Sequence, residues 1–116
     1  MDRLQDLFKI LADETRLRIL LLLYHKELCV CEISNILQIS QPKVSRHLAK
    51  LRDVGYVRDE RQGQWIFYHL NIDDPLPKEI LKTIISRIHE YPLASKDLER
   101  LSEMEKNNRL CERKNL

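Results

Sequence analysis

The sequence predicts a mainly α-helical fold with one small β-hairpin, and three observations lead to this prediction. Apolar residues recur at helical spacing over most of the 116 residues. Between residues 56 and 70 the pattern becomes β-rich on both sides of a glycine turn. Capping and breaking residues divide the rest into short elements. Because a domain of this size leaves much of its surface unburied, we expect oligomerisation to bury more of it.

Two helices are expected in the N-terminal part of the chain. The first has an apolar stripe at i, i+3, i+4 and i+7 spacing, formed by Leu4, Leu7, Phe8 and Leu11. Asp13 is expected to cap the second helix, which runs to about His25. This helix is apolar on nearly all sides from Leu17 to Tyr24, so we expect it to lie buried at the centre of the domain.

Two shorter helices follow. The third is expected from Leu28 to Leu37. Ser40 is expected to cap the fourth, Pro42 is tolerated in its first turn, and Gly55 ends it. The apolar stripe of the fourth helix is formed by Val44, Leu48 and Leu51. This arrangement leaves a polar and basic face outside the core.

A hairpin and a further helix are expected after Gly55. The hairpin strands are predicted at residues 56–60 and 65–70. Pro75 and Pro77 then bracket a connection, and an isoleucine-rich helix is expected over residues 79–89.

The expected order of helix, turn, basic helix and hairpin is that of a winged helix-turn-helix. We assign residues 1–92 to this DNA-binding and dimerisation domain, and residues 93–116 to a charged C-terminal tail that is partly helical or flexible. Dimerisation is expected through the first helix and the isoleucine-rich helix. Alternatively, their apolar stripes close the core of a single copy.

The second helix of the helix-turn-helix carries candidate contacts to nucleic acid. Residues 41–65 hold more basic than acidic side chains, although the net charge of the whole chain is only +2. Such a helix fits the major groove of double-stranded DNA, with the hairpin tip beside it. The expected DNA contacts are Gln41, Lys43, Ser45, Arg46, His47, Lys50, Arg61, Gln62 and Gln64. The alternative is a solvated helix face with an ordinary hairpin.

Cys29 and Cys31 form a candidate site for a thiophilic ion at the start of the third helix. Helical residues i and i+2 point about 200° apart. Both sulfurs can therefore bind one ion only if the start of the helix unwinds or if binding takes place just outside the helix. A helix N-terminus is expected to lower the pKa of a thiol there. Cys111 is either a third ligand or an idle thiol. The alternative for the pair is two small buried hydrophobes.

Several classes of protein are disfavoured. The longest apolar run, Ile19 to Leu23, is too short to span a bilayer, and the N-terminus lacks a signal-peptide pattern, so we expect a cytoplasmic protein without membrane contact. The two glycines, Gly55 and Gly63, form no phosphate-binding loop, and no catalytic arrangement is evident. We expect no enzymatic activity and no small organic substrate. The four histidines lack paired metal-ligand spacing.

Several segments, in this order, resemble the ArsR/SmtB family, and most closely its arsenical-resistance repressors. They are Leu7–Leu20, Glu27–Glu32, Ser40–Arg52 and Gln62–Trp65 with Tyr68. The resemblance implies a homodimeric repressor that binds a palindromic operator in double-stranded DNA. It also implies that As(III) or Sb(III) binds Cys29 and Cys31 as inducer and releases the DNA, without an organic cofactor.

The sequence departs from this family pattern at one ligand position. Arsenic sensors of this type have a third cysteine where this chain has Ser34, so either an external ligand or Cys111 completes the site. The cadmium and lead sensors add cysteines from an N-terminal extension, whereas residues 1–28 contain none. The zinc-sensing branch places ligands on its last helix, where residues 78–90 offer only His89 and two glutamates. These departures favour trivalent arsenic or antimony.

Two other functions remain open on the same sequence. The first is a transcriptional regulator that senses thiol oxidation or persulfidation through Cys29, Cys31 or Cys111. The second is a small protein-interaction module without a DNA role, which would show no salt-dependent binding to duplex DNA. For the ion-sensing function, we expect binding to distort the start of the third helix and so to lower DNA affinity.

Overall fold

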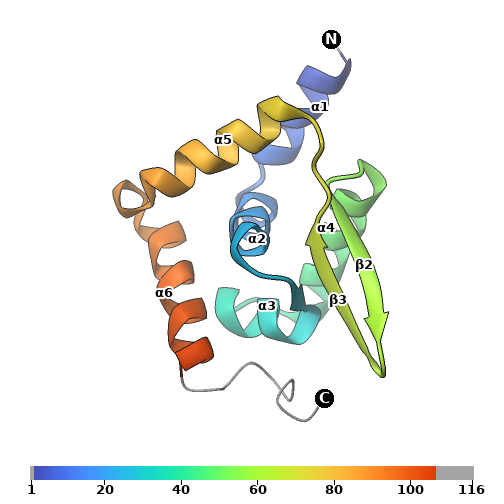
Figure 1. Ribbon diagram of the computed structural model, residues 1–116, viewed down its shortest axis with the longest axis vertical. Helices are drawn as coiled ribbons and strands as arrows, with labels where there is room; N and C mark the ends of the chain where they lie inside the picture. Colours follow the sequence, from blue (N-terminus) through green and yellow to red (C-terminus); the bar gives the residue numbers. More distant parts are fainter. Residues whose placement is uncertain (1, 107–116) are drawn as a thin grey trace.

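The computed structural model describes residues 2–106, which form six α-helices, one 3₁₀ helix and a three-stranded sheet (Figure 1). The elements are α1 (Asp2–Leu11), α2 (Glu14–His25), β1 (Leu28–Cys29), α3 (Val30–Leu37), α4 (Gln41–Asp53), β2 (Val57–Gln62), β3 (Trp65–Leu70), α5 (Pro75–Ser86), η1 (Ile88–Glu90) and α6 (Pro92–Lys106). The mainly helical fold with a small hairpin is confirmed. Within the described residues, no helix is both long enough and apolar enough to cross a membrane.

Helix α2 is the centre of the molecule, as its all-round apolar sequence predicts. Figure 1 shows it surrounded by α3, α4, α5 and α6, and every residue from Ile19 to Leu23 is buried. Asp13 is its N-cap, and the carboxylate of this residue accepts a hydrogen bond from the Arg16 backbone N–H at 3.0 Å. Capping and burial together fix the helix against which the other elements pack.

The helix-turn-helix is formed by α3 and α4. Gln38 ends α3 in the left-handed region at φ 60°, and Ser40 caps α4 by accepting from the Lys43 backbone N–H at 3.4 Å. The predicted stripe of α4, formed by Val44, Leu48 and Leu51, is fully buried. Gly55, at φ 84°, follows α4 and turns the chain towards the sheet.

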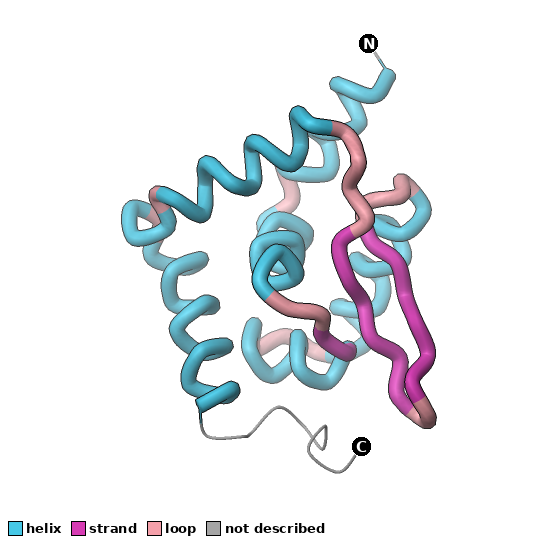
Figure 2. Tube along the Cα trace, in the orientation of Figure 1, coloured by secondary structure: helices cyan, strands magenta, loops and turns pink. Residues whose placement is uncertain are grey.

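The sheet has the strand order β1-β3-β2 and is antiparallel throughout (Figure 2). Strands β2 and β3 form the predicted hairpin, and Gln62 pairs with Trp65 across a two-residue turn in which Gly63 has φ 65°. The short strand β1 was not predicted, because Leu28 and Cys29 were assigned to the third helix. That assignment is wrong: both residues pair with the free edge of β3, and the helix begins only at Val30.

Helix α5 begins and ends earlier than the sequence suggests. Pro75 and Pro77 do not bracket a connection; they lie in the first turn of α5, where a missing N–H is no loss. Asp74 caps this turn by accepting from the Leu76 backbone N–H at 3.3 Å, and α5 ends at Ser86 rather than near residue 89. Helix α6 starts at Pro92 and packs against α2 and α3.

The two stripes expected to form a dimer interface are divided between core and surface. In α1, Leu7 is buried, whereas Leu4 and Phe8 are exposed, and 58% of Phe8 is accessible. In α5, Leu81 is buried and Ile84 is half-buried. Both helices therefore contribute to the core of a single copy, and α1 also leaves Leu4 and Phe8 exposed.

Candidate functional site

Cys29 lies immediately before α3, as the N-cap residue, with extended backbone angles of φ −90° and ψ 168°. Its side chain is 4% exposed, and the residue pairs with Phe67 in the sheet. The Cys29 backbone N–H donates to Glu32 Oε1 at 3.0 Å, and the Glu32 backbone N–H faces the Cys29 sulfur in return. This reciprocal capping arrangement fixes the start of α3.

Cys31 lies one residue inside the helix, in its first turn, and is half-buried. Asn35 Nδ2, one turn further along α3, donates to Cys31 Sγ at 3.9 Å. The two cysteines therefore straddle the helix start: Cys29 has extended backbone and Cys31 has helical backbone. Cys111 lies outside the described residues.

Ser34 is the position at which the sequence departs from the resemblance to the arsenic sensors. Its hydroxyl donates to the Ile39 carbonyl at 2.5 Å and so closes the turn after α3. Within residues 2–106, no group of three or more histidine, cysteine, aspartate or glutamate side chains is arranged to hold a metal ion. Cys29 and Cys31 are the cysteines in this part of the chain.

The expected lowering of the pKa at this helix start is wrong for Cys29. Burial raises the pKa of the Cys29 thiol; the Glu32 backbone N–H lowers it, and the negative charge of Glu32 raises it further. Desolvation of the sulfur thus outweighs the N-terminal helix field. Cys29 is a free, protonated thiol at neutral pH.

The candidate DNA contacts, apart from His47, have exposed side chains. Helix α4 exposes the side chains of Gln41, Lys43, Ser45, Arg46 and Lys50, and the end of the hairpin exposes those of Arg61, Gln62 and Gln64. Figure 1 shows α4 beside the hairpin formed by β2 and β3, and α4 contacts β2. Gln62 Nε2 also donates to Glu27 Oε1 at 3.4 Å, which links the hairpin to the segment before β1.

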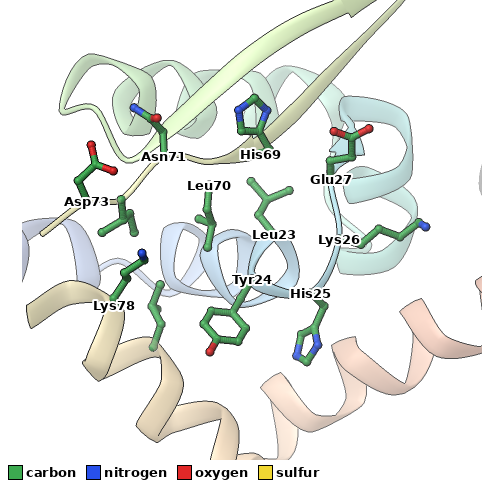
Figure 3. Close-up of a pocket in the computed structure, with 12 residues that line it drawn as sticks. Leu23, Tyr24, His25, Lys26, Glu27, His69, Leu70, Asn71, Asp73 and Lys78 are labelled. Atoms are coloured by element: carbon green, nitrogen blue, oxygen red, sulfur yellow. The ribbon is translucent and has the colours of Figure 1, made fainter. Parts of the chain in front are cut away.

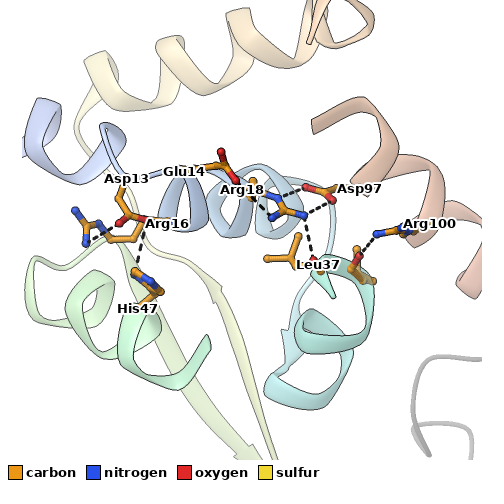
Figure 4. Close-up of polar contacts among 9 residues, drawn as sticks. Asp13, Glu14, Arg16, Arg18, Leu37, His47, Asp97 and Arg100 are labelled. Carbon is orange, nitrogen blue, oxygen red and sulfur yellow. Dashed lines mark hydrogen bonds and ion pairs between the residues drawn. The ribbon is translucent and has the colours of Figure 1, made fainter. Parts of the chain in front are cut away.

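His47 is the member of the predicted set that the structure separates from the others. Its side chain is 18% exposed, and its Nδ1 lies 3.9 Å from Asp13 Oδ1, at the N-cap of α2 (Figure 4). Burial lowers the pKa of His47, with Asp13 opposing this effect. His47 is therefore neutral at pH 7 and packs between α4 and the start of α2.

A separate polar hollow lies at the other end of α2, between the end of β3 and the start of α5 (Figure 3). His25, His69, Glu27 and Lys78 are among the residues that line it. It lies away from the exposed outer face of α4.

Sequence reasoning missed Glu32, which is 1% exposed and holds the start of α3. The signal was present as a capping-box spacing, in which a glutamate follows the N-cap residue by three positions. Because cysteine is not among the usual N-cap residues, this spacing alone does not predict that Glu32 caps the helix.

The fold and this site together define a class: a winged helix-turn-helix protein with a cysteine pair at the first helix of its DNA-reading unit. Residues 13–59 match the family described as bacterial regulatory protein, arsR family. The chain belongs to this family.

Relatives with known names agree with this assignment. The arsenic resistance transcriptional regulator ArsR1 of Pseudomonas putida is 46% identical over 99 residues, which cover 84% of this chain and 76% of that protein. The arsenical resistance operon repressor of Escherichia coli is 59% identical over 67 residues, which cover 57% of each chain. The structure of the AntR antimony-specific transcriptional repressor matches with a TM-score of 0.65 and 32% identity, over 77% of this chain and 79% of that one.

Proposed function

We propose that this protein is a transcriptional repressor that binds operator DNA as a homodimer and releases it when As(III) or Sb(III) binds Cys29 and Cys31. The observation that carries the proposal is the position of the two cysteines on either side of the start of α3, the helix that leads directly into α4. The names of the relatives, which concern arsenic, arsenical and antimony response, support the same ligand class.

Operator binding would use the exposed outer face of α4. Arg46 and Lys43 supply donors for base edges and phosphates in the major groove, and the hairpin tip supplies Arg61 for an adjacent groove or backbone. Two such units in a dimer would read half-sites about one turn of DNA apart. His47, which faces Asp13, is better placed to hold α4 against α2 than to contact a base.

Ligand binding would join arsenic to sulfur with loss of water. Arsenous acid carries three hydroxyl groups, and each protonated thiol that condenses with it releases one water molecule and forms one As–S bond. Cys29 is such a protonated thiol, and soft sulfur donors favour thiophilic ions of this kind. Cys29 would provide one bond. Cys31 is disulfide-bonded in this structure, so a thiol reductant must first supply two electrons to restore the Cys31 thiol, which would then provide the second bond. The third would be to Cys111 or to a retained hydroxyl.

Release of DNA would follow from deformation at the start of α3. We expect the Cys29 sulfur to leave its buried position beside Glu32 when it and Cys31 bind one arsenic atom. That movement would disturb the capping hydrogen bonds. It would also disturb the pairing of β1 with β3, and this pairing connects the start of α3 to the hairpin formed by β2 and β3. A coupling of about 1–3 kcal/mol, or roughly 5–150-fold in affinity, would produce a useful response.

The test is a DNA-binding titration with and without arsenite, on a duplex selected from a random pool. We expect Cys29→Ser and Cys31→Ser to bind the duplex as the wild type does and to remain bound when arsenite is added. Normal release of either variant would place the ligand elsewhere. Arg46→Ala should weaken binding and reduce its dependence on salt, with Lys82→Ala as a charge-matched control on the surface of α5.

Peroxide and polysulfide titrations of the same complex separate arsenic sensing from thiol redox sensing. The raised pKa of Cys29 disfavours oxidation at that thiol, since the thiolate is the form that oxidants attack, whereas Cys31 is disulfide-bonded in this structure. Release by peroxide but not by arsenite would support that alternative instead.

A further inference from the structure

A buried ion pair joins α6 to α2. Arg18 Nε donates to Asp97 Oδ2 at 2.8 Å, and Arg18 Nη2 donates to Asp97 Oδ1 at 2.9 Å (Figure 4). Asp97 is 2% exposed and Arg18 is 9% exposed. Such a two-point contact fixes orientation as well as distance, because the planar guanidinium matches the carboxylate.

The same group of residues also holds the end of α3. Arg18 Nη2 donates to the Leu37 carbonyl at 3.1 Å, and Arg100 Nη1 donates to the Ile36 carbonyl at 3.2 Å. Carbonyls in the last turn of a helix have no partner within the helix, and a positive charge there is favoured. We call Arg18, Asp97 and Arg100 the α6 clamp.

The clamp and the cysteine pair lie at opposite ends of one short helix. Helix α3 has 8 residues and is about 12 Å long, so its two ends lie close together. Cys29 is its N-cap, and Leu37 ends it four positions before the first residue of α4. The clamp therefore holds the end of α3 that determines where α4 starts.

A role in stability alone does not explain this arrangement well. A buried ion pair is weak evidence for stability, because apolar residues of similar size often do as well or better. Here the two arginines also donate hydrogen bonds to the backbone carbonyls of Ile36 and Leu37, and so fix the orientation of the last turn of α3. Asp97 and Arg100 also lie beyond residues 13–59, the segment that matches the family. The clamp thus ties that segment to a helix outside it.

We propose that the α6 clamp is a positioning device for DNA binding. By holding the C-terminal end of α3, Arg18, Asp97 and Arg100 keep α4 in the orientation that the operator requires. Helix α6 then determines DNA affinity although the candidate DNA contacts lie on α4 and the hairpin. This inference rests on the DNA-binding part of the proposed function and is independent of which ligand releases the DNA.

The decisive variant is Arg100→Met in the full chain. It removes the hydrogen bond to the Ile36 carbonyl, keeps most of the apolar stem and leaves no buried charge without a partner. Lys96→Met is the matched control, because Lys96 is an exposed cation on the same helix. Both variants lose one positive charge, so a difference between them does not arise from net charge.

We expect Arg100→Met to raise the dissociation constant for the operator about fivefold or more relative to Lys96→Met, at a temperature where both are fully folded. Amide hydrogen exchange in residues 36–41 should also be faster in Arg100→Met than in the control, without any DNA present. Asp97→Asn, which keeps the size and removes the charge, should shift both readouts in the same direction if it folds.

Equal operator affinity and equal exchange in Arg100→Met and Lys96→Met would overturn the proposal, whatever Asp97→Asn does. A lower melting temperature with unchanged operator affinity would also overturn it, since that is the result of a purely structural role. The clamp readouts use ligand-free protein. Wild-type protein that binds the operator but ignores arsenite would therefore contradict the proposed inducer and leave the clamp result valid.

Discussion

The backbone N–H of Cys29 and the carboxylate of Glu32 are joined by a hydrogen bond of 3.0 Å, across the boundary between strand β1 and helix α3. This contact connects the candidate ligand residue to the first turn of the helix-turn-helix. A ligand that draws the Cys29 sulfur towards Cys31 must act on it. We therefore expect the geometry of the start of α3 to change when a ligand binds Cys29.

Replacing Glu32 by alanine should destabilise the fold. The variant leaves the Cys29 N–H buried without its acceptor, which costs about 1–3 kcal/mol of unfolding free energy. Glu32→Gln keeps an acceptor oxygen at the same place and should cost less. Urea unfolding followed by circular dichroism measures both. If the alanine variant were as stable as the wild type, the hydrogen bond would not hold the helix start.

The Cys29 thiol should react slowly with alkylating reagents near neutral pH. Its pKa lies above the ordinary value of 9.0 because burial and the Glu32 charge disfavour the thiolate. In a Cys31→Ser, Cys111→Ser variant, the rate of reaction with iodoacetamide should rise with pH through a midpoint above that value. The same variant unfolded in urea is the control and should show an ordinary midpoint. A midpoint below 9.0 in the folded protein would mean that folding lowers the pKa of Cys29, which contradicts the assigned direction.

Asp13→Ala should destabilise the protein by about 0.5–2 kcal/mol, because the N-cap of the central helix is lost. Burial alone would raise the pKa of Asp13, but the Arg16 N–H and the nearby His47 and Arg16 lower it overall. The stabilisation is therefore fully present above the ordinary value of 3.8 and disappears as the pH falls through the lower folded value.

Urea unfolding at a series of pH values measures this effect, with Asp73→Ala as an exposed control. A difference between wild type and Asp13→Ala that stayed constant down to pH 2 would contradict the assigned direction of the shift.

Phe8→Ser should weaken the proposed dimer and leave the fold of each copy intact. Phe8 is 58% exposed on α1, whereas the neighbouring Leu7 is buried in the core of the same copy. Sedimentation equilibrium should show a larger dimer dissociation constant for Phe8→Ser. Lys9→Ser, an exposed change on the same helix, is the control. An unchanged dimer would remove Phe8 from the interface.

The parts of the fold that the sequence predicted are those set by neighbouring residues. Asp13 and Ser40 cap their helices locally. Gly55 and Gly63 have positive φ, at the helix end and the hairpin turn that the sequence predicted. These features follow from side-chain chemistry within about four positions, so a sequence pattern contains them.

The parts that were not predicted depend on residues far apart in the chain. Strand β1 exists because Leu28 and Cys29 find the free edge of β3, and local periodicity does not encode that pairing. The bond between Arg18 and Asp97 joins residues 79 positions apart. The raised pKa of Cys29 likewise comes from burial, which overrides the local helix field that the sequence suggested.

The most direct test of the account is the distance between Cys29 N and Glu32 Oε1 in a crystal structure of the arsenite-loaded protein. We predict that both cysteine sulfurs are bonded to arsenic and that this distance has increased beyond hydrogen-bonding range from its value of 3.0 Å. Two As–S bonds to Cys29 and Cys31 with the hydrogen bond intact would contradict the claim that ligand binding deforms the start of α3.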